Sequence, residues 1–265
     1  MNSLDKIIEK LKSNDAVDAV FITGSIGTKT NTSHSDIDLI VILKDNSKEI
    51  ESIFTWFDGI FADIYFFDLE NIKEIKESLF LPSQNPKIKH KMNAFLYLWL
   101  KKGDIRFDKS GELTNLKLLD KEIRVPQTQI FRSWNNTNYN SEANTRYFNS
   151  NDPLYHEALE IRLMYSVPQI VCSYLDFLGK PWEGEKKAIT YLKECDTDFY
   201  NLFIKYTKAT NLAERFSVYK QMTERVFSLN PKYKIWDKTE IIAKSQKEQF
   251  ENNNDLVEHW QNLIA

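Results

Sequence analysis

The sequence is poor in the residues that tie small folds together through disulfides or bound zinc. Its 265 residues include two cysteines and four histidines. Cys172 and Cys195 stand apart, with no CxxC motif or Cys/His cluster, so no disulfide framework and no zinc site is predicted. A chain of this length can bury a full core without such links. We expect both cysteines to be reduced residues of a cytoplasmic protein.

An excess of charge of one sign and long apolar runs are also missing. The 35 basic and 38 acidic residues leave a formal net charge of −3, which provides no broad basic surface for nucleic acid. The run AFLYLWL at 94–100 is far shorter than the ~18 apolar residues of a membrane helix. The N-terminus lacks the apolar core of a signal peptide. We therefore predict a cytoplasmic protein that has neither nucleic acid nor a membrane as a partner.

Glycine is scarce as well, yet two of the seven glycines lie in one short turn. Gly24 and Gly27 follow a predicted strand that spans 16–22. A glycine turn that leads into a helix exposes backbone N–H groups that can hold an anion, and the Ser25 hydroxyl would add a donor. The turn therefore predicts a phosphate site.

Three aspartates lie on the strands that come next. Asp36 and Asp38 are two residues apart at the start of an apolar strand over 37–43, so their side chains share one face. Two parallel carboxylates repel each other unless a cation lies between them, and Mg²⁺ prefers such hard oxygen ligands. Asp63 has apolar neighbours on a third strand over 60–67, where an unpaired carboxylate would be costly. Solvated acids at strand ends are the alternative interpretation.

Hydrophobic periodicity predicts an α+β protein with two domains. Strands and helices alternate over residues 1–125, which predicts a mixed sheet with helices. In that region we expect helices over 3–13, 47–59, 69–80 and 88–102, and a short strand over 104–107. Residues 126–265 mostly follow a helical period, with breaks near 179–181, 195–198 and 230–231, and predict an all-α helical bundle.

These motifs together resemble the nucleotidyltransferase superfamily, which includes DNA polymerase beta and the antibiotic nucleotidyltransferases. The resemblance rests on Gly24-Ser25, Asp36-Ile37-Asp38 and Asp63, in order and with the right intervening elements. The sub-pattern SDIDL at 35–39 is similar to that of the bacterial small-molecule branch. RFDKSGEL at 106–113 and LGKPWEGEKK at 178–187 are more loosely similar to segments of the antibiotic-modifying members.

The resemblance implies a catalytic domain over 1–125 and a helical acceptor-binding domain over 126–265. It implies Mg²⁺-dependent transfer of a nucleoside monophosphate, such as AMP from ATP, to a hydroxyl of a small molecule, with release of pyrophosphate. Asp36, Asp38 and Asp63 would be the catalytic and metal-binding residues, with Asp63 either a third ligand or a general base.

The nucleotide-binding residues follow from the same resemblance and from charge. Gly24 and Ser25 would hold the β- and γ-phosphates, and Ser35 belongs to the same nucleotide site. Lys186 and Lys187 could reach phosphates as point charges. A solvated helix start is the alternative explanation of these two lysines, and the one we favour.

The sequence leaves the acceptor and the biological role open. An antibiotic is one expectation, and the near-neutral charge favours a weakly charged lincosamide over a polycationic aminoglycoside. A protein-modifying nucleotidyltransferase of antitoxin type and a non-catalytic nucleotide-binding scaffold are the alternatives. A homodimer also stays open.

Overall fold

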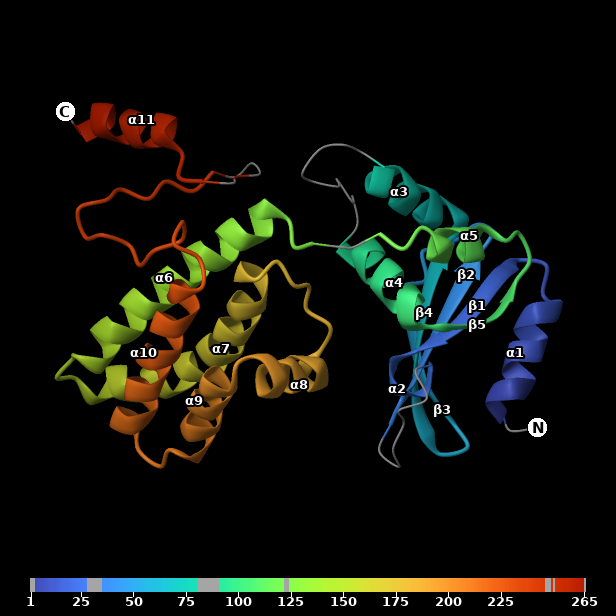
Figure 1. The fold of residues 1–265 in the computed structure, drawn as a ribbon, viewed down its shortest axis with the longest axis horizontal. Helices are drawn as coiled ribbons and strands as arrows, with labels where there is room; N and C mark the ends of the chain where they lie inside the picture. The colour runs from blue at the N-terminus through green and yellow to red at the C-terminus, as the bar shows by residue number, and fades with distance from the viewer. Residues whose placement is uncertain are drawn as a thin grey trace. The chain divides into compact units, whose positions relative to one another are not determined.

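A computed structural model describes residues 3–27, 35–80, 91–121, 124–245, 249 and 251–264 (Figure 1). The chain divides into two compact units, Met1–Ile123 and Arg124–Ala265. Each unit is described by itself.

The first unit is built on one five-stranded mixed sheet. Its strands are β1 (Val17–Thr23), β2 (Ile37–Leu43), β3 (Ser52–Phe57), β4 (Ile60–Asp68) and β5 (Asp104–Asp108). They are ordered β3-β4-β2-β1-β5. β2 and β4 are parallel, and the other neighbouring pairs are antiparallel. The predicted α+β class with a mixed sheet is confirmed.

Helices cover both faces of this sheet, which explains the continuous apolar runs of the central strands. On one face, α1 (Ser3–Ser13) packs Leu4 and Ile8 against β1 and β2. On the other face, α3 (Leu69–Phe80), α4 (Lys91–Lys102) and α5 (Glu112–Leu118) contribute to a second core around Phe21 and Ile40. All seven residues of β1 are buried. The short α2 (Gly24–Gly27) follows β1 directly.

The predicted helix over 47–59 is wrong, because Ser52–Phe57 forms the edge strand β3. Asp58 and Gly59 connect β3 to β4 in a two-residue hairpin, and both have positive φ, 51° and 81°. This is the conformation of a type I′ turn, for which Asp-Gly is a preferred sequence. The turn residue that was interpreted as a helix end is therefore the turn of a hairpin.

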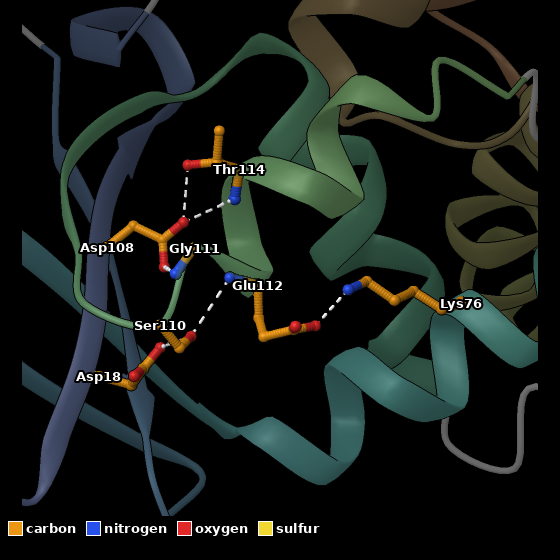
Figure 2. A network of polar contacts seen from close by, with 7 residues as sticks. All are labelled: Asp18, Lys76, Asp108, Ser110, Gly111, Glu112 and Thr114. Atoms are coloured by element: carbon orange, nitrogen blue, oxygen red, sulfur yellow. Dashed lines mark hydrogen bonds and ion pairs between the residues drawn. The ribbon is translucent and has the colours of Figure 1, made fainter.

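The segment from β5 into α5 is held by a network of polar contacts (Figure 2). The Asp108 carboxylate accepts hydrogen bonds from the backbone N–H of Gly111 at 3.0 Å and of Thr114 at 2.7 Å. Ser110 Oγ donates to the buried Asp18 at 2.7 Å. An ion pair joins Glu112, at the start of α5, to Lys76 of α3. The loosely matched segment 106–113 thus fixes α5 against the sheet, as part of the scaffold of this unit.

The second unit is helical, as predicted, with breaks at or next to the three positions that periodicity indicated. Its helices are α6 (Gln127–Phe148), α7 (Pro153–Phe177), α8 (Glu185–Cys195), α9 (Thr197–Lys208), α10 (Leu212–Ser228) and α11 (Asn254–Ile264). A single apolar core draws on α6 to α10. Among the described helices of the whole chain, none has the length and apolarity to cross a membrane.

A row of polar side chains, here called the polar seam, joins α6 to α7 within this helical unit. Four cross-helix hydrogen bonds make up the row: Ser133 to Asp176, Thr137 to Ser173, Asn140 to Gln169 and Asn144 to Ser166. The α6 residues recur at intervals of four and three, so they share one helix face. Asn140 and Asn144 of α6 thus have hydrogen-bond partners on α7.

Candidate metal and nucleotide site

Three carboxylates meet on one face of the sheet in the first unit because of how the strands pair. β1 ends at Thr23, which lies opposite Asp38 of β2. Asp38 in turn lies opposite Asp63 in the parallel β2–β4 pair. Asp36 directly precedes β2, two residues from Asp38, so all three carboxylates lie on the same sheet face. The register of three strands thus assembles what the sequence lists as separate motifs.

The carboxylate group is tight and carries like charges. One oxygen from each of Asp36, Asp38 and Asp63 lies within 4.8 Å of the other two, and all three residues are partly buried. The pKa of Asp63 is raised by burial, and further by the charge of Asp36. Two negative groups at such a distance destabilise each other's charged forms.

Asp63 also has an oxygen that this fold does not satisfy. Its Oδ1 is buried, and no hydrogen-bond donor in the described part of the chain reaches it. Leaving a buried acceptor unsatisfied normally costs about 1–3 kcal/mol. A cation bound between the carboxylates would satisfy this oxygen and relieve the repulsion.

The donor set fits Mg²⁺. All three side chains supply hard carboxylate oxygens, the ligand type that Mg²⁺ prefers together with water and substrate phosphates. Within the described residues, this is the group of acidic, histidine or cysteine side chains whose spacing could hold a metal ion. Asp36, Asp38 and Asp63 would therefore hold the ion.

Gly24 lies against this carboxylate group. Its φ is +63°, in the left-handed region, and a Cβ added there would lie 1.9 Å from Asp38 Oδ2. Only glycine meets both conditions without displacing the carboxylate or straining the backbone. The turn after β1 and the metal site are therefore adjacent, as a phosphate next to a metal would require.

Tyr65 is a further residue of this neighbourhood. It follows Asp63 by two positions on β4, so it lies on the same face. Its pKa is raised, first by burial and then by the charges of Asp63 and Asp38. Its ring packs on Trp99 of α4, with centroids 5.2 Å apart. Tyr65 therefore packs against the apolar core and also senses the charge of the carboxylate group.

The other predicted nucleotide-binding residues lie in α2, just before β2 and at the start of α8. Ser25 lies in α2, and its side chain is outside the described part of the structure. Ser35 is partly buried next to Asp36. Lys186 and Lys187 are exposed in the first turn of α8, in the second unit, where Lys187 pairs with Glu183 at 2.9 Å. Their contact with phosphate stays a prediction.

A comparison with known protein families matches most of the first unit. The model of the family described as "Nucleotidyltransferase domain" matches residues 4–109, which include all five strands and the three aspartates. The first unit carries a nucleotidyltransferase domain. The predicted enzyme class, nucleotidyltransferase, is thereby confirmed.

Two further comparisons add little to that result. A solved structure of a nucleotidyltransferase-like protein from Exiguobacterium sibiricum 255-15 is 13% identical, with a TM-score of 0.48. The match covers 84% of this chain and 73% of that chain. No curated protein matches the sequence significantly.

Sequence reasoning missed the strand beside Asp63 in the nucleotidyltransferase domain. Phe54 of β3 lies directly opposite Asp63 of β4, and Trp56 lies opposite Phe61. The Asp58-Gly59 pair was the available signal, because a two-residue turn sets the register on both sides of it. Counting outward from that turn places residue 54 opposite residue 63.

Proposed function

We propose that this protein transfers a nucleoside monophosphate from a nucleoside triphosphate to a hydroxyl of a small molecule and releases pyrophosphate. The observation that carries the proposal is the group of three converging carboxylates, with a buried unsatisfied oxygen, on a nucleotidyltransferase domain. ATP is the proposed donor, and an antibiotic, with a lincosamide first, is the proposed acceptor.

The residues of the chain divide the work of an in-line displacement. Bound Mg²⁺ supplies charge stabilisation for the attacking and leaving oxygens. Asp36 and Asp38 hold the ion, and Gly24 lets phosphate approach it, because no Cβ fills the space beside Asp38. Gly24 and Ser25 hold the β- and γ-phosphates, so pyrophosphate departs on the β1 side.

Asp63 is the proposed third ligand, with general base as its alternative role. Its unsatisfied Oδ1 favours ligation, because a metal would occupy that oxygen. Its raised pKa favours proton transfer, because a base works best with a pKa closer to the working pH. The two roles differ in metal affinity: removing a ligand weakens Mg²⁺ binding, whereas removing only a base slows turnover.

The helical second unit is the proposed acceptor-binding domain. It also underlies our preference for a small-molecule acceptor over a protein, because a unit with its own core provides a built-in surface. Lys186 and Lys187 at the start of α8 are proposed to contact phosphates. A homodimer is a further proposal that size measurement in solution would test.

The proposal is tested by incubating the purified protein with Mg²⁺, each of the four nucleoside triphosphates and pooled lincosamides and aminoglycosides. Mass spectrometry should find an acceptor heavier by one nucleoside monophosphate, and Asp38→Asn should remove that product. Triphosphate binding without any product would contradict small-molecule transfer. A copurified protein that becomes heavier by one nucleoside monophosphate with ATP would contradict transfer to a small molecule and indicate protein modification instead.

A further inference from the structure

The β3–β4 hairpin presents aromatic rings to solvent beside the carboxylate group. Trp56 is 64% exposed, Phe54 58% and Phe61 39%. Edge strands of soluble proteins are usually protected by charge or cover, because exposed apolar edges promote association. A cluster of large exposed apolar side chains therefore calls for a ligand or partner. We call Phe54, Trp56 and Phe61 the aromatic platform.

The platform and the metal site share one face of the sheet. Directly paired residues on neighbouring strands lie on the same face. Asp38 pairs with Asp63, Asp63 with Phe54, and Phe61 with Trp56. Phe61 also precedes Asp63 by two residues, and so lies on the same side. Phe61 therefore lies beside the carboxylate group on β4, and Phe54 and Trp56 continue the same face one strand further out, on β3.

The three rings of the platform pack against one another. The Phe54 and Phe61 rings are nearly parallel, at 7°, with centroids 6.3 Å apart. Trp56 meets Phe61 edge to face, with centroids 5.4 Å apart. The tight Asp58-Gly59 turn fixes the two strands that carry the rings. Rings held in this way bind another ring with little loss of side-chain freedom.

The strand order decides which substrate this platform would meet. The proposed phosphate turn at Gly24 follows β1, and the aromatic platform lies on β3 and β4, on the other side of β2. In an in-line displacement the attacking and leaving oxygens lie on opposite sides of the transferred phosphorus. If pyrophosphate leaves toward β1, the attacking hydroxyl enters from the β4 and β3 side.

We infer that the aromatic platform binds the acceptor, and that the acceptor carries its reactive hydroxyl next to a ring with an apolar face. This ring can be an aromatic ring or a sugar ring with an apolar face, because both kinds of ring stack on aromatic side chains. This inference rests on the proposed function. It adds a class of acceptor, and it adds acceptor-binding residues of the first unit to the acceptor-binding role proposed for the second.

The test compares ring removal on the platform with the same change on the opposite face of the hairpin. Phe54→Ala and Trp56→Ala are the test variants. Ile53→Ala is the matched control, because Ile53 is also exposed, at 45%, and neighbours Phe54 on β3 but points to the other face. Circular dichroism and thermal unfolding first establish that all three variants fold like the parent protein.

With the acceptor found in the mass-spectrometry screen, each platform variant should raise the acceptor KM about tenfold, since one stacked ring contributes about that factor in affinity. The apparent affinity for Mg²⁺–triphosphate and the kcat at saturating acceptor should stay at parent values. Ile53→Ala should change none of these. An acceptor KM that stays unchanged in both platform variants overturns the inference.

A change in triphosphate affinity with an unchanged acceptor KM would assign the platform to the donor base, and also overturns the inference. An equal rise of the acceptor KM in Ile53→Ala and Phe54→Ala would indicate a surface that uses both faces of the hairpin, such as a protein interface. This result would also overturn the inference.

A binding measurement separates failure of the inference from failure of the proposed function. Saturation-transfer NMR with lincomycin and 4-nitrophenyl glucoside as probes, in the presence of Mg²⁺ and a non-hydrolysable triphosphate, needs no turnover. Ring signals that are lost in Phe54→Ala support the platform even if no product forms, in which case only the proposed transfer fails. Absence of binding by both probes, or binding that Phe54→Ala leaves intact, overturns the platform.

Discussion

Asp63 in the first unit and Asp176 in the second are both partly or fully buried aspartates, but they differ in the hydrogen-bond donors and charges around them. Burial raises the pKa of both. Around Asp176, Ser133 and Gln129 donate hydrogen bonds that offset the burial. Around Asp63 the charge of Asp36 adds to the burial, and Oδ1 has no donor in the described part of the chain. A buried acid with hydrogen-bond donors stabilises a fold, whereas an acid that is crowded by like charge and lacks a donor fits the proposed metal site.

The same contrast extends to the neighbourhoods of the two aspartates. In the polar seam, the Arg162 guanidinium donates to Asn144 at 2.6 Å and to Asn140 at 3.0 Å, so amide oxygens on α6 are satisfied from α7. In the carboxylate group of the first unit, three acids are brought within 4.8 Å. The bonds of the seam come from the chain itself, whereas the carboxylate group includes a buried oxygen for which the described part of the chain provides no donor.

The largest effect is expected from Asp36→Asn. Turnover should fall by more than about a hundredfold, because a bound metal contributes several kcal/mol to such transfers and each ~1.4 kcal/mol is a factor of ten. The melting temperature without metal should be equal or higher, because the repulsion with Asp63 is removed. Mg²⁺ should stabilise the parent protein and not this variant. Differential scanning fluorimetry with and without Mg²⁺ measures both effects.

Asp45→Asn is the matched control for that change, because Asp45 is an exposed acid just beyond the far end of β2. It should keep parent turnover and the parent response to Mg²⁺. Turnover retained in Asp36→Asn would contradict the metal site.

Asp176→Ala should have the opposite effects: it should lower the stability of the fold and leave the response to Mg²⁺ intact. Removing the acceptor leaves the buried Ser133 hydroxyl without this partner, so the free energy of unfolding should fall by about 1–3 kcal/mol. Mg²⁺ should still stabilise the variant as it does the parent. Urea unfolding with and without Mg²⁺ gives both quantities. A loss of the Mg²⁺ response here would break the comparison between the two aspartates.

Gly24→Ala should have an intermediate effect. A left-handed backbone costs a non-glycine residue about 1–2 kcal/mol, and the new Cβ would collide with the Asp38 carboxylate. We expect lower stability together with weaker Mg²⁺ binding, measured by urea unfolding and by metal titration. Gly111→Ala is the control, because its φ is also positive, at +77°, but nothing lies within 4 Å of its Cβ position. It should lose stability without losing metal affinity.

The smallest effect is the pH dependence of stability. Asp63 has a raised pKa in the folded state and the ordinary value of 3.8 when unfolded. The folded state therefore binds the proton more tightly. The stability that this proton contributes is present below pH 3.8 and is lost as the pH rises through the folded pKa. The same sign holds for Asp176, whose pKa is also raised.

Saturating Mg²⁺ should separate the two aspartates, because a metal holds a ligating carboxylate in its charged form. Urea midpoints over about pH 3.5–6.5 should show the loss attributable to Asp63 reversed by Mg²⁺, and that attributable to Asp176 unchanged. Asp63→Asn and Asp176→Asn identify the two contributions. An Asp63 contribution that Mg²⁺ does not alter would count against ligation by Asp63.

Much of the fold was accessible from local pattern. The apolar runs of β1, β2 and β4 and the helical period after residue 126 predicted the right classes of structure. β3 was missed because residues 52–57 carry apolar side chains on both faces, at an exposed edge, which a helical period also fits. The Asp58-Gly59 turn was the stronger signal, because two consecutive positive φ values are compatible with a hairpin and not with a helix.

The sequence by itself determined that Asp36 and Asp38 share a face, because strand periodicity is a property of the local backbone. Only the tertiary structure decided that Asp63 faces Asp38 and that Phe54 faces Asp63. Strand order and register come from pairing between distant segments, which local pattern does not encode. The buried Oδ1 and the raised pKa of Asp63 follow from that pairing, because only a packed neighbourhood removes solvent and brings like charges together.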